Sequence, residues 1–161
     1  MPYLINKDIQ KLIKLNSIIT SPSFNKNQIQ PASLDLSLSS RCYRIKASFI
    51  PNNQKISKII KELSLVNIDL NSEYLFEKNC IYLCELNEKL NLPKEIKGKS
   101  NPKSTTGRLD IFTRLITENG TEYDEIDYNY SGKLYLEIIP QSFSIKLKKN
   151  ICLNQVRFFE G

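Results

Sequence analysis

The chain has 161 residues, of which 40% are apolar and 25% are charged, and this composition is typical of one compact globular domain. No run of about 18 apolar residues occurs, which excludes a membrane-spanning helix, and the first residues do not resemble a secretory signal. The net charge of +6 suits a polyanionic small ligand. Because no aromatic residues alternate with the lysines of residues 94–103 and 146–149, we expect no nucleic-acid partner, and we expect a cytoplasmic protein.

Two short helices are predicted in the first half of the chain. Over residues 6–15, apolar side chains recur at helical spacing on one face, and Asn6 can cap the first turn. Over residues 51–64, a Pro-Asn-Asn turn precedes apolar side chains at the same spacing. These side chains are Ile56, Ile59, Ile60 and Leu63. Each helix would therefore place one apolar face against a core.

Most of the remaining segments alternate polar and apolar residues with a period of two. The alternation over residues 33–38 predicts a strand with one face in solvent. Residues 99–106 are polar and irregular, which predicts a loop. The other predicted strands are residues 42–49, 66–70, 74–86, 133–139, 143–147 and 151–159. Many short strands, few helices and frequent turns together predict a mainly β fold, either a sandwich or a barrel.

The chain has no histidine and four cysteines. The lack of histidine excludes an imidazole base and a His-x-Glu zinc site. Cys80 and Cys84 lie close in sequence, but Cys42 and Cys152 stand alone, so the paired ligands of a structural zinc site are missing. We therefore expect reduced, buried thiols and no zinc. Hydrolytic chemistry would have to use a carboxylate, an amine or a hydroxyl.

Glu137 is the carboxylate of greatest interest. Within residues 134–139, strict alternation places Glu137 on the same face as Tyr135 and Ile139. From this segment alone, an ordinary solvent-facing glutamate is one interpretation. The other is a general base held among bulky neighbours in a cleft.

Two further segments carry groups suited to a ligand. Residues 103–108, Lys-Ser-Thr-Thr-Gly-Arg, combine two cations, three hydroxyls and a glycine, which suit an anion. Their order is not that of a Walker A loop, and a solvated polar loop is the alternative. Residues 126–132, Ile-Asp-Tyr-Asn-Tyr-Ser-Gly, predict a turn in which an aspartate and an aromatic ring could cradle a sugar.

Taken in order, these segments resemble the motifs of the trimeric deoxycytidine triphosphate (dCTP) deaminase and deoxyuridine triphosphatase (dUTPase) superfamily. The matching segments are residues 30–36, the deaminase motif at 103–109, the sugar motif at 126–132, the catalytic Leu-Glu at 136–137 and the closing strand at 153–158. Three residues depart from the usual motifs. Lys103 replaces an arginine, Asn129 replaces a glycine, and Asp110 stands where a glycine is common.

The resemblance is greatest to the first half of the long, two-repeat bacterial deaminases. We therefore expect residues 1–161 to form one dUTPase-like domain, either alone or as the first half of a longer enzyme. No second repeat is found in the sequence. The resemblance further implies a distorted jelly roll with one or two short helices, assembled as a homotrimer or pseudo-trimer that shares its active sites at subunit interfaces.

The activity implied by the resemblance is hydrolytic deamination of dCTP to dUTP and ammonia. Glu137 would transfer a proton between water and the leaving amino group at C4 of cytosine, Ser104 would hold the water, and Arg108 would stabilise developing charge. The implied substrate-binding residues are Lys103 at the phosphates, Asp127 at the deoxyribose, and Thr105, Tyr130 and Gln155. Mg²⁺ would accompany the triphosphate.

Two alternatives remain open. A dUTP diphosphatase, or a bifunctional enzyme that performs both steps, would share the fold and the Asp127 turn, but diphosphatase activity does not need a glutamate at position 137. The other alternative is a catalytically incomplete, nucleotide-binding half that assembles with another chain.

Overall fold

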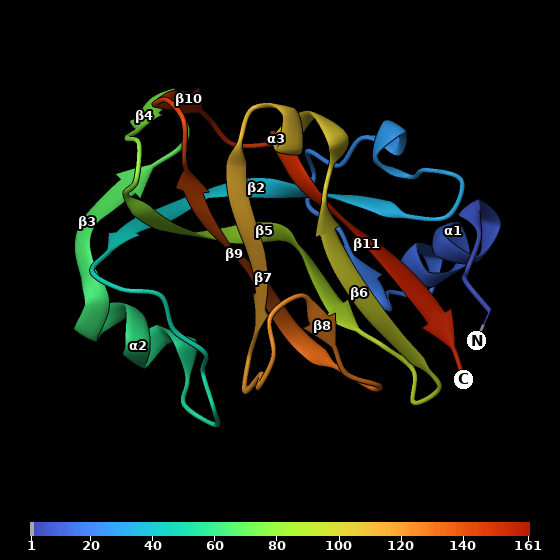
Figure 1. The fold of residues 1–161 in the computed structure, drawn as a ribbon. Coiled ribbons are helices and arrows are strands. Elements are labelled where there is room, and N and C mark those ends of the chain that lie inside the picture. Colours follow the sequence, from blue (N-terminus) through green and yellow to red (C-terminus); the bar gives the residue numbers. More distant parts are fainter. Residues whose placement is uncertain (1) are drawn as a thin grey trace.

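The fold is built around one large antiparallel sheet whose strands wrap about a common core (Figure 1). The computed structural model describes residues 2–161. The strand order is β7-β9-β5-β2-β11-β6-β8, and β1 and β3 pair with β5 and β2. The strands are β1 (Ile18–Ile19), β2 (Leu34–Ile45), β3 (Ser64–Asp69), β5 (Ile81–Asn91), β6 (Ile96–Pro102), β7 (Ile111–Thr117), β8 (Glu125–Ile126), β9 (Ser131–Pro140) and β11 (Cys152–Glu160). The predicted mainly β sandwich or barrel is confirmed.

A separate two-stranded sheet pairs β4 (Tyr74–Phe76) with β10 (Ile145–Leu147). The prediction of one strand over residues 74–86 was therefore too long. The chain turns between β4 and β5, where Asn79 adopts a positive φ of 64°. Asparagine tolerates this left-handed conformation better than most residues, so an asparagine at position 79 favours the turn.

Both predicted helices are present. They are α1 (Asn6–Lys14) and α2 (Ile56–Leu63), and the structure adds η1 (Lys26–Gln28) and α3 (Ser104–Arg108). The predicted cap of α1 is wrong, because Asn6 lies inside the helix and Ile5 is the capping position. The backbone N–H of Ile5 donates to the carboxylate of Asp8 at 2.9 Å, so Asp8 caps this end by reaching back along the chain.

The predicted solvent face of residues 33–38 is also wrong. Asp35 and Ser37 are buried, and one continuous strand, β2, replaces the two predicted ones. The reason is a polar network inside the fold. Glu88 of β5, itself buried, accepts hydrogen bonds from the backbone N–H and the hydroxyl of Ser37 at 2.8 and 2.7 Å. Alternation in this strand therefore separates two buried environments and not core from solvent.

Residues 99–106 form regular structure where a loop was predicted. β6 continues to Pro102 because it pairs with β11 along its whole length, from Ile96↔Glu160 to Pro102↔Asn154. The following helix, α3, is fastened by Thr106, whose hydroxyl donates to the carbonyl of Leu153 in β11 at 2.7 Å. Pairing with a distant strand thus overrides a weak local pattern.

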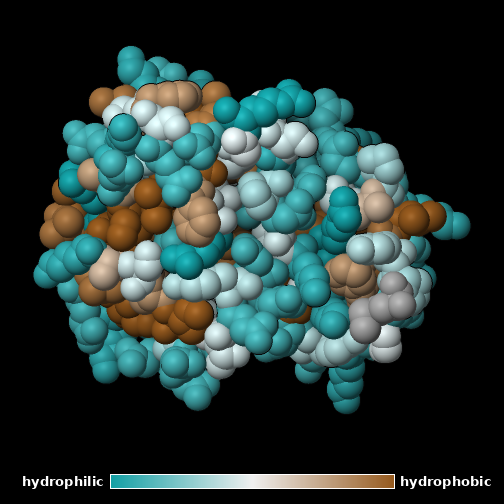
Figure 2. Space-filling view, in the orientation of Figure 1, coloured by the Kyte–Doolittle hydropathy of each residue, from teal (hydrophilic) through white to brown (hydrophobic). Residues whose placement is uncertain are grey.

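Two apolar clusters lie on opposite faces of β9. Leu134, Leu136 and Ile138 enter the main core, whereas Tyr135 belongs to a smaller cluster under α2. The other buried members of the smaller cluster are Ile45, Ile56, Leu83 and Ile116. Figure 2 shows apolar surface on the side of the molecule where α2 and β3 lie. Within residues 2–161, no helix has the length and hydrophobicity needed to cross a bilayer.

Candidate active site

Glu137 lies in β9 with its side chain fully buried, so the solvent-facing interpretation is wrong. The β7–β9 register places Arg114 directly opposite. The Arg114 guanidinium donates a hydrogen bond from Nε to one carboxylate oxygen of Glu137, Oε1, at 2.9 Å, and its Nη2 lies 2.8 Å from the same oxygen in an ion pair. The charge of Glu137 is therefore compensated by a cation from the neighbouring strand.

Two aromatic rings hold the guanidinium of Arg114. Its Cζ atom lies 3.8 Å from the ring centroid of Tyr123 and 5.0 Å from that of Phe112. The Tyr123 hydroxyl donates to the carbonyl of Phe49 at 3.0 Å, which fixes the ring in turn. Burial raises the pKa of Tyr123, so this hydroxyl stays a neutral donor at physiological pH. The guanidinium is thus confined between aromatic faces and Glu137.

The second carboxylate oxygen of Glu137, Oε2, is buried and makes no hydrogen bond within residues 2–161. A further acid, Asp124, is close enough to interact electrostatically with both Arg114 and Glu137. Its Oδ1 accepts a hydrogen bond from the backbone N–H of Leu115 at 2.7 Å, and burial raises its pKa. Two acids and one guanidinium therefore share a poorly solvated site, with one oxygen of Glu137 left free as an acceptor.

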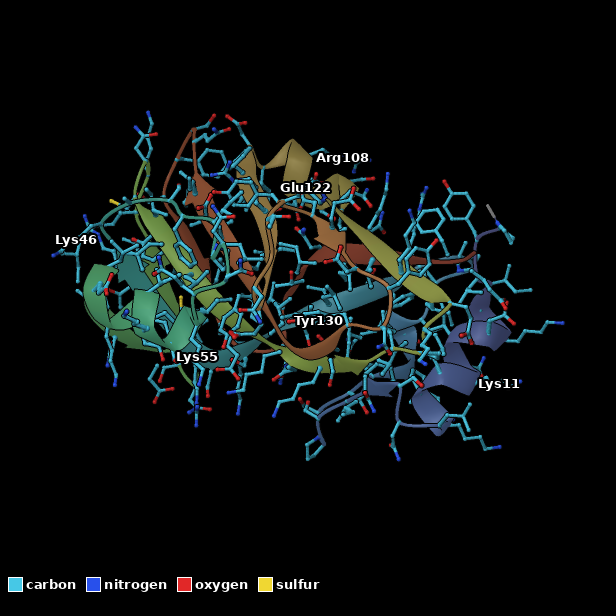
Figure 3. All side chains as sticks on the ribbon, turned by 90° about the horizontal axis from the view of Figure 1, so that it is seen from below. Lys11, Lys46, Lys55, Arg108, Glu122 and Tyr130 are labelled. Carbon is cyan, nitrogen blue, oxygen red and sulfur yellow. The ribbon has the colours of Figure 1, made fainter. Side chains whose placement is uncertain are left out.

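The other two predicted catalytic residues, Ser104 and Arg108, are exposed on α3, as is Thr105. Arg108 lies at the rim of the molecule (Figure 3). Within the described part of the chain, no hydrogen bond or ion pair joins Ser104 or Arg108 to Glu137. Ile111, at the start of β7, pairs with Pro140, which is about 10 Å along the strand from Glu137 at 3.3 Å per residue. The chain by itself does not bring the predicted catalytic residues together.

Lys103 and Gln155 both neighbour Asp35 of β2. The Lys103 ammonium lies 2.6 Å from Oδ2 of the buried Asp35, and Gln155 is opposite Asp35 in the β2–β11 register. The other oxygen of Asp35 is buried and makes no hydrogen bond within residues 2–161. The predicted phosphate contact of Lys103 would therefore be made by an ammonium that already pairs with a carboxylate.

The predicted sugar turn places Asp127 in solvent and anchors Tyr130. The Tyr130 hydroxyl accepts from the backbone N–H of Glu118 at 2.9 Å and donates to the carbonyl of Lys133 at 2.6 Å. Burial raises the pKa of Tyr130 to about 12. Tyr130 thus holds the turn in shape, while the Asp127 carboxylate remains accessible.

Backbone conformation explains two of the departures from the family motifs. Asn129 has a φ of 63° and Asp110 has a φ of 53°, and both positions hold a glycine in the usual motif. Glycine, asparagine and aspartate are the residues that best tolerate this left-handed region. The replacements therefore keep the same backbone path.

Sequence reasoning missed Arg114, Tyr123 and Asp124 as members of the site. The available signals were weak: the chain has five arginines, and period-two alternation places Phe112 and Arg114 on one face of a strand. What joins Arg114 to Glu137 is the register between β7 and β9, and this register is not visible in the sequence.

The four cysteines form no disulfide. Cys42 and Cys84 are buried, Cys80 and Cys152 are half-buried, and all four are free thiols. Among residues 2–161, no group of three or more Cys, Asp or Glu side chains is arranged to hold a metal ion.

Comparison with known proteins identifies the class of enzyme first. A solved structure of 2'-deoxycytidine 5'-triphosphate deaminase from Agrobacterium tumefaciens matches 99% of the chain with a TM-score of 0.96 and 39% identity, and the chain spans 46% of that protein. Proteins named "dCTP deaminase, dUMP-forming" from Nanoarchaeum equitans and Methanosphaera stadtmanae are each 28% identical. The matches cover 97% and 86% of the chain and 83% and 68% of those proteins. The fold is therefore that of the dCTP deaminases, as the motifs predicted.

The family itself follows from a family model. The model described as the 2'-deoxycytidine 5'-triphosphate deaminase N-terminal domain matches residues 3–161. The chain belongs to this family.

Proposed function

We propose that this chain catalyses the hydrolytic deamination of dCTP to dUTP and ammonia. The observation that carries the proposal is Glu137, a fully buried carboxylate with one oxygen free to accept a proton, in a chain of the deaminase family. With no histidine in the chain, a carboxylate is the group best suited to general acid–base chemistry near neutral pH.

The proposed reaction balances around this carboxylate. The oxygen of water bonds to C4 of cytosine as Glu137 accepts one of the water protons. Glu137 passes that proton to N3 as the electrons of the C4–N3 double bond move onto N3. It then carries the proton of the new C4 hydroxyl to the amino group, the bond from C4 to the amino nitrogen breaks, and ammonia leaves as the C4 carbonyl forms. Because Glu137 is fully buried, admission of the cytosine ring requires local movement of the residues around it.

The remaining predicted site residues lie at two places, on or beside α3 and in the turn of residues 126–132. Arg108 and Ser104 on α3 would act on developing charge and on the water, and Lys103, Thr105 and Gln155 would contact the substrate beside them. Asp127 would bind the deoxyribose in the turn that Tyr130 shapes. Mg²⁺ would arrive with the triphosphate as part of the substrate.

Assembly is the second part of the proposal. Residues of α3 are exposed and separate from Glu137 within one chain, which supports a site completed by α3 of a neighbouring subunit. A homotrimer, or a pseudo-trimer that includes a second repeat, would provide this arrangement. The chain spans less than half of the Agrobacterium tumefaciens protein, which favours the domain acting as one repeat of a longer enzyme.

A bifunctional enzyme is the second candidate. The names of the curated relatives state that they form dUMP, so the same site would also release pyrophosphate from the nucleotide. Deamination is common to both candidates.

Product analysis tests the proposal. The purified protein is incubated with dCTP and Mg²⁺, ammonia is measured enzymatically, and nucleotides are separated by chromatography. Ammonia with dUTP supports the deaminase, and ammonia with dUMP and pyrophosphate supports the bifunctional enzyme. Pyrophosphate release from dUTP with no turnover of dCTP would contradict deamination. Nucleotide binding without turnover would indicate an incomplete half.

A further inference from the structure

We infer that Arg114 is a positioning residue for Glu137, and that Oε2 of Glu137 is the oxygen that exchanges a proton with water. This inference rests on the proposed deaminase function. It adds to that function separate roles for the two oxygens of the Glu137 carboxylate. It also adds Arg114, which lies outside the sequence motifs.

The hydrogen bonds of the pair are unevenly distributed. A guanidinium facing a carboxylate can bond both oxygens with two parallel N–H groups. Here the hydrogen bond from Nε of Arg114 and the ion-pair contact of Nη2 both fall on Oε1 of Glu137, and Oε2 receives no hydrogen bond from residues 2–161 although it is buried. Leaving a buried carboxylate oxygen without a donor is unfavourable. The arrangement favours a role in which Oε2 meets a donor that arrives with the substrate.

The surroundings of Arg114 explain how the carboxylate keeps this orientation. Arg114 and Glu137 face each other in paired strands, so their backbones are fixed relative to each other. The guanidinium cannot rotate freely because the rings of Tyr123 and Phe112 flank it. Tyr123 is tied to Phe49 by its hydroxyl. Contacts therefore connect Tyr123 through Arg114 to Oε1 of Glu137. Oε2 is left available to exchange a proton with water.

The charge balance points the same way. Glu137 has no solvent-exposed surface and Asp124 adds a second acid nearby, while Arg114 is the cation that directly contacts Glu137. Removal of the guanidinium would leave a buried carboxylate without its counter-ion. Arg114 therefore supplies the counter-charge that this buried carboxylate needs.

The test compares variants of the full chain in the dCTP assay. Arg114→Met removes the charge, and with it the hydrogen bond and the ion pair to Glu137, and Arg114→Lys keeps the charge. We expect kcat of Arg114→Met to fall about 10- to 100-fold with KM changed by less than about threefold, and part of kcat to return in Arg114→Lys. Arg157→Met removes an arginine that also lies over a tyrosine ring, that of Tyr3, and should leave kcat unchanged.

A double-variant comparison separates positioning from general structural support. If Arg114 acts through Glu137, adding Arg114→Met to Glu137→Gln should lower the residual rate no further. If Arg114→Met does not fold, two variants of Tyr123 provide the test instead. Tyr123→Phe keeps the ring beside the guanidinium, so it should retain several-fold more activity than Tyr123→Leu. Thermal unfolding of each variant ensures that rates are measured on folded protein.

Three outcomes would overturn the inference. One is a folded Arg114→Met enzyme with wild-type kcat, and another is a further multiplicative loss in the Glu137→Gln background. Equal activity of the two Tyr123 variants is the third. Failure of the proposed function is recognised separately, because the wild-type protein would then release no ammonia from dCTP, and the inference would fall with it.

Discussion

Cys42 of β2 and Cys84 of β5 lie directly opposite each other in the sheet, with their sulfur atoms 2.7 Å apart. Both side chains are buried, and burial raises the pKa of the Cys84 thiol well above its usual range. The two thiols therefore act as small core residues shielded from solvent, and the Cys84 thiol is held in its neutral form.

Thiol reactivity should follow this arrangement. At pH 8, iodoacetamide should modify the half-buried Cys80 before the other cysteines, because Cys42 and Cys84 are buried and burial raises the pKa of Cys152 to about 12. Peptide mass spectrometry after timed quenching measures the order. In guanidinium chloride all four should react at similar rates. Early modification of Cys84 in the native protein would show that this part of the sheet opens readily.

Replacement of Glu137 by glutamine should abolish most of the activity. An amide side chain cannot accept a proton from water, so we expect Glu137→Gln to reduce deamination by about 10²-fold or more while nucleotide binding is retained. Ammonia release and equilibrium binding of dCTP measure the two effects. The control is Glu122→Gln, which changes an exposed glutamate in the same way. Near-full turnover of Glu137→Gln would exclude the proposed base.

Two glycines should respond in opposite directions to alanine. Gly132 has a φ of +153°, and an added Cβ would lie 3.0 Å from the Tyr130 hydroxyl, so Gly132→Ala should lower the free energy of unfolding by about 1–3 kcal/mol. Gly107 lies in α3 with no atom within 4 Å of such a Cβ, so Gly107→Ala should be neutral or stabilising by up to about 1 kcal/mol. Urea unfolding measures both. A stable Gly132→Ala protein would mean that the turn adapts at little cost.

Stability should decline at alkaline pH because of Tyr130. Its pKa is about 12 in the folded chain and about 10 when unfolded, so the folded state holds the proton more tightly. The resulting stabilisation is complete below pH 10 and is lost as the pH rises from about 10 to about 12. Tyr130→Phe should flatten this part of the curve of unfolding free energy against pH. The same curve for Tyr128→Phe, which changes an exposed tyrosine of that turn, is the comparison. An unchanged slope in Tyr130→Phe would assign the effect to other buried tyrosines.

The active protein should be an assembly in which α3 of a neighbouring chain completes each active site. Light scattering of the purified protein should give a mass close to three chains, or a similar mass when a second-repeat polypeptide is supplied. Mixing two inactive variants, Glu137→Gln and Arg108→Ala, should restore part of the activity if each subunit pair combines one intact Glu137 with one intact Arg108. Full activity of a strict monomer would contradict a shared site.

The sequence predicted the elements better than their surroundings. The periodicity of α1 and α2 was readable because each helix has one apolar face with a clear period. Burial of Asp35 and Ser37 was not readable, because polar partners from distant strands make both faces of β2 internal. Local alternation reports which residues share a face, but it does not report what covers that face.

In the candidate site, too, the local sequence indicated individual residues but not their neighbours in space. Ordered motifs led to the prediction that Glu137 and the segments 103–108 and 126–132 belong to the site. Arg114 was not recognised because its role depends on a strand register that joins residues 23 positions apart. The separation of Glu137 from α3 is likewise a property of the three-dimensional arrangement, which the motif order does not contain.

The position of β11 between β2 and β6 bears on how the chain folds. Val156 of β11 pairs with Leu34 near one end of the sequence and with Ser100 much later in it, so the centre of the sheet closes only when distant segments meet. Chains dominated by such non-local pairings fold in milliseconds to seconds, far more slowly than helical bundles. Until β11 docks, β2 and β6 have unpaired edges that invite association with other chains. Correct assembly of this protein is therefore a competition in time between closing its own sheet and joining that of a neighbour.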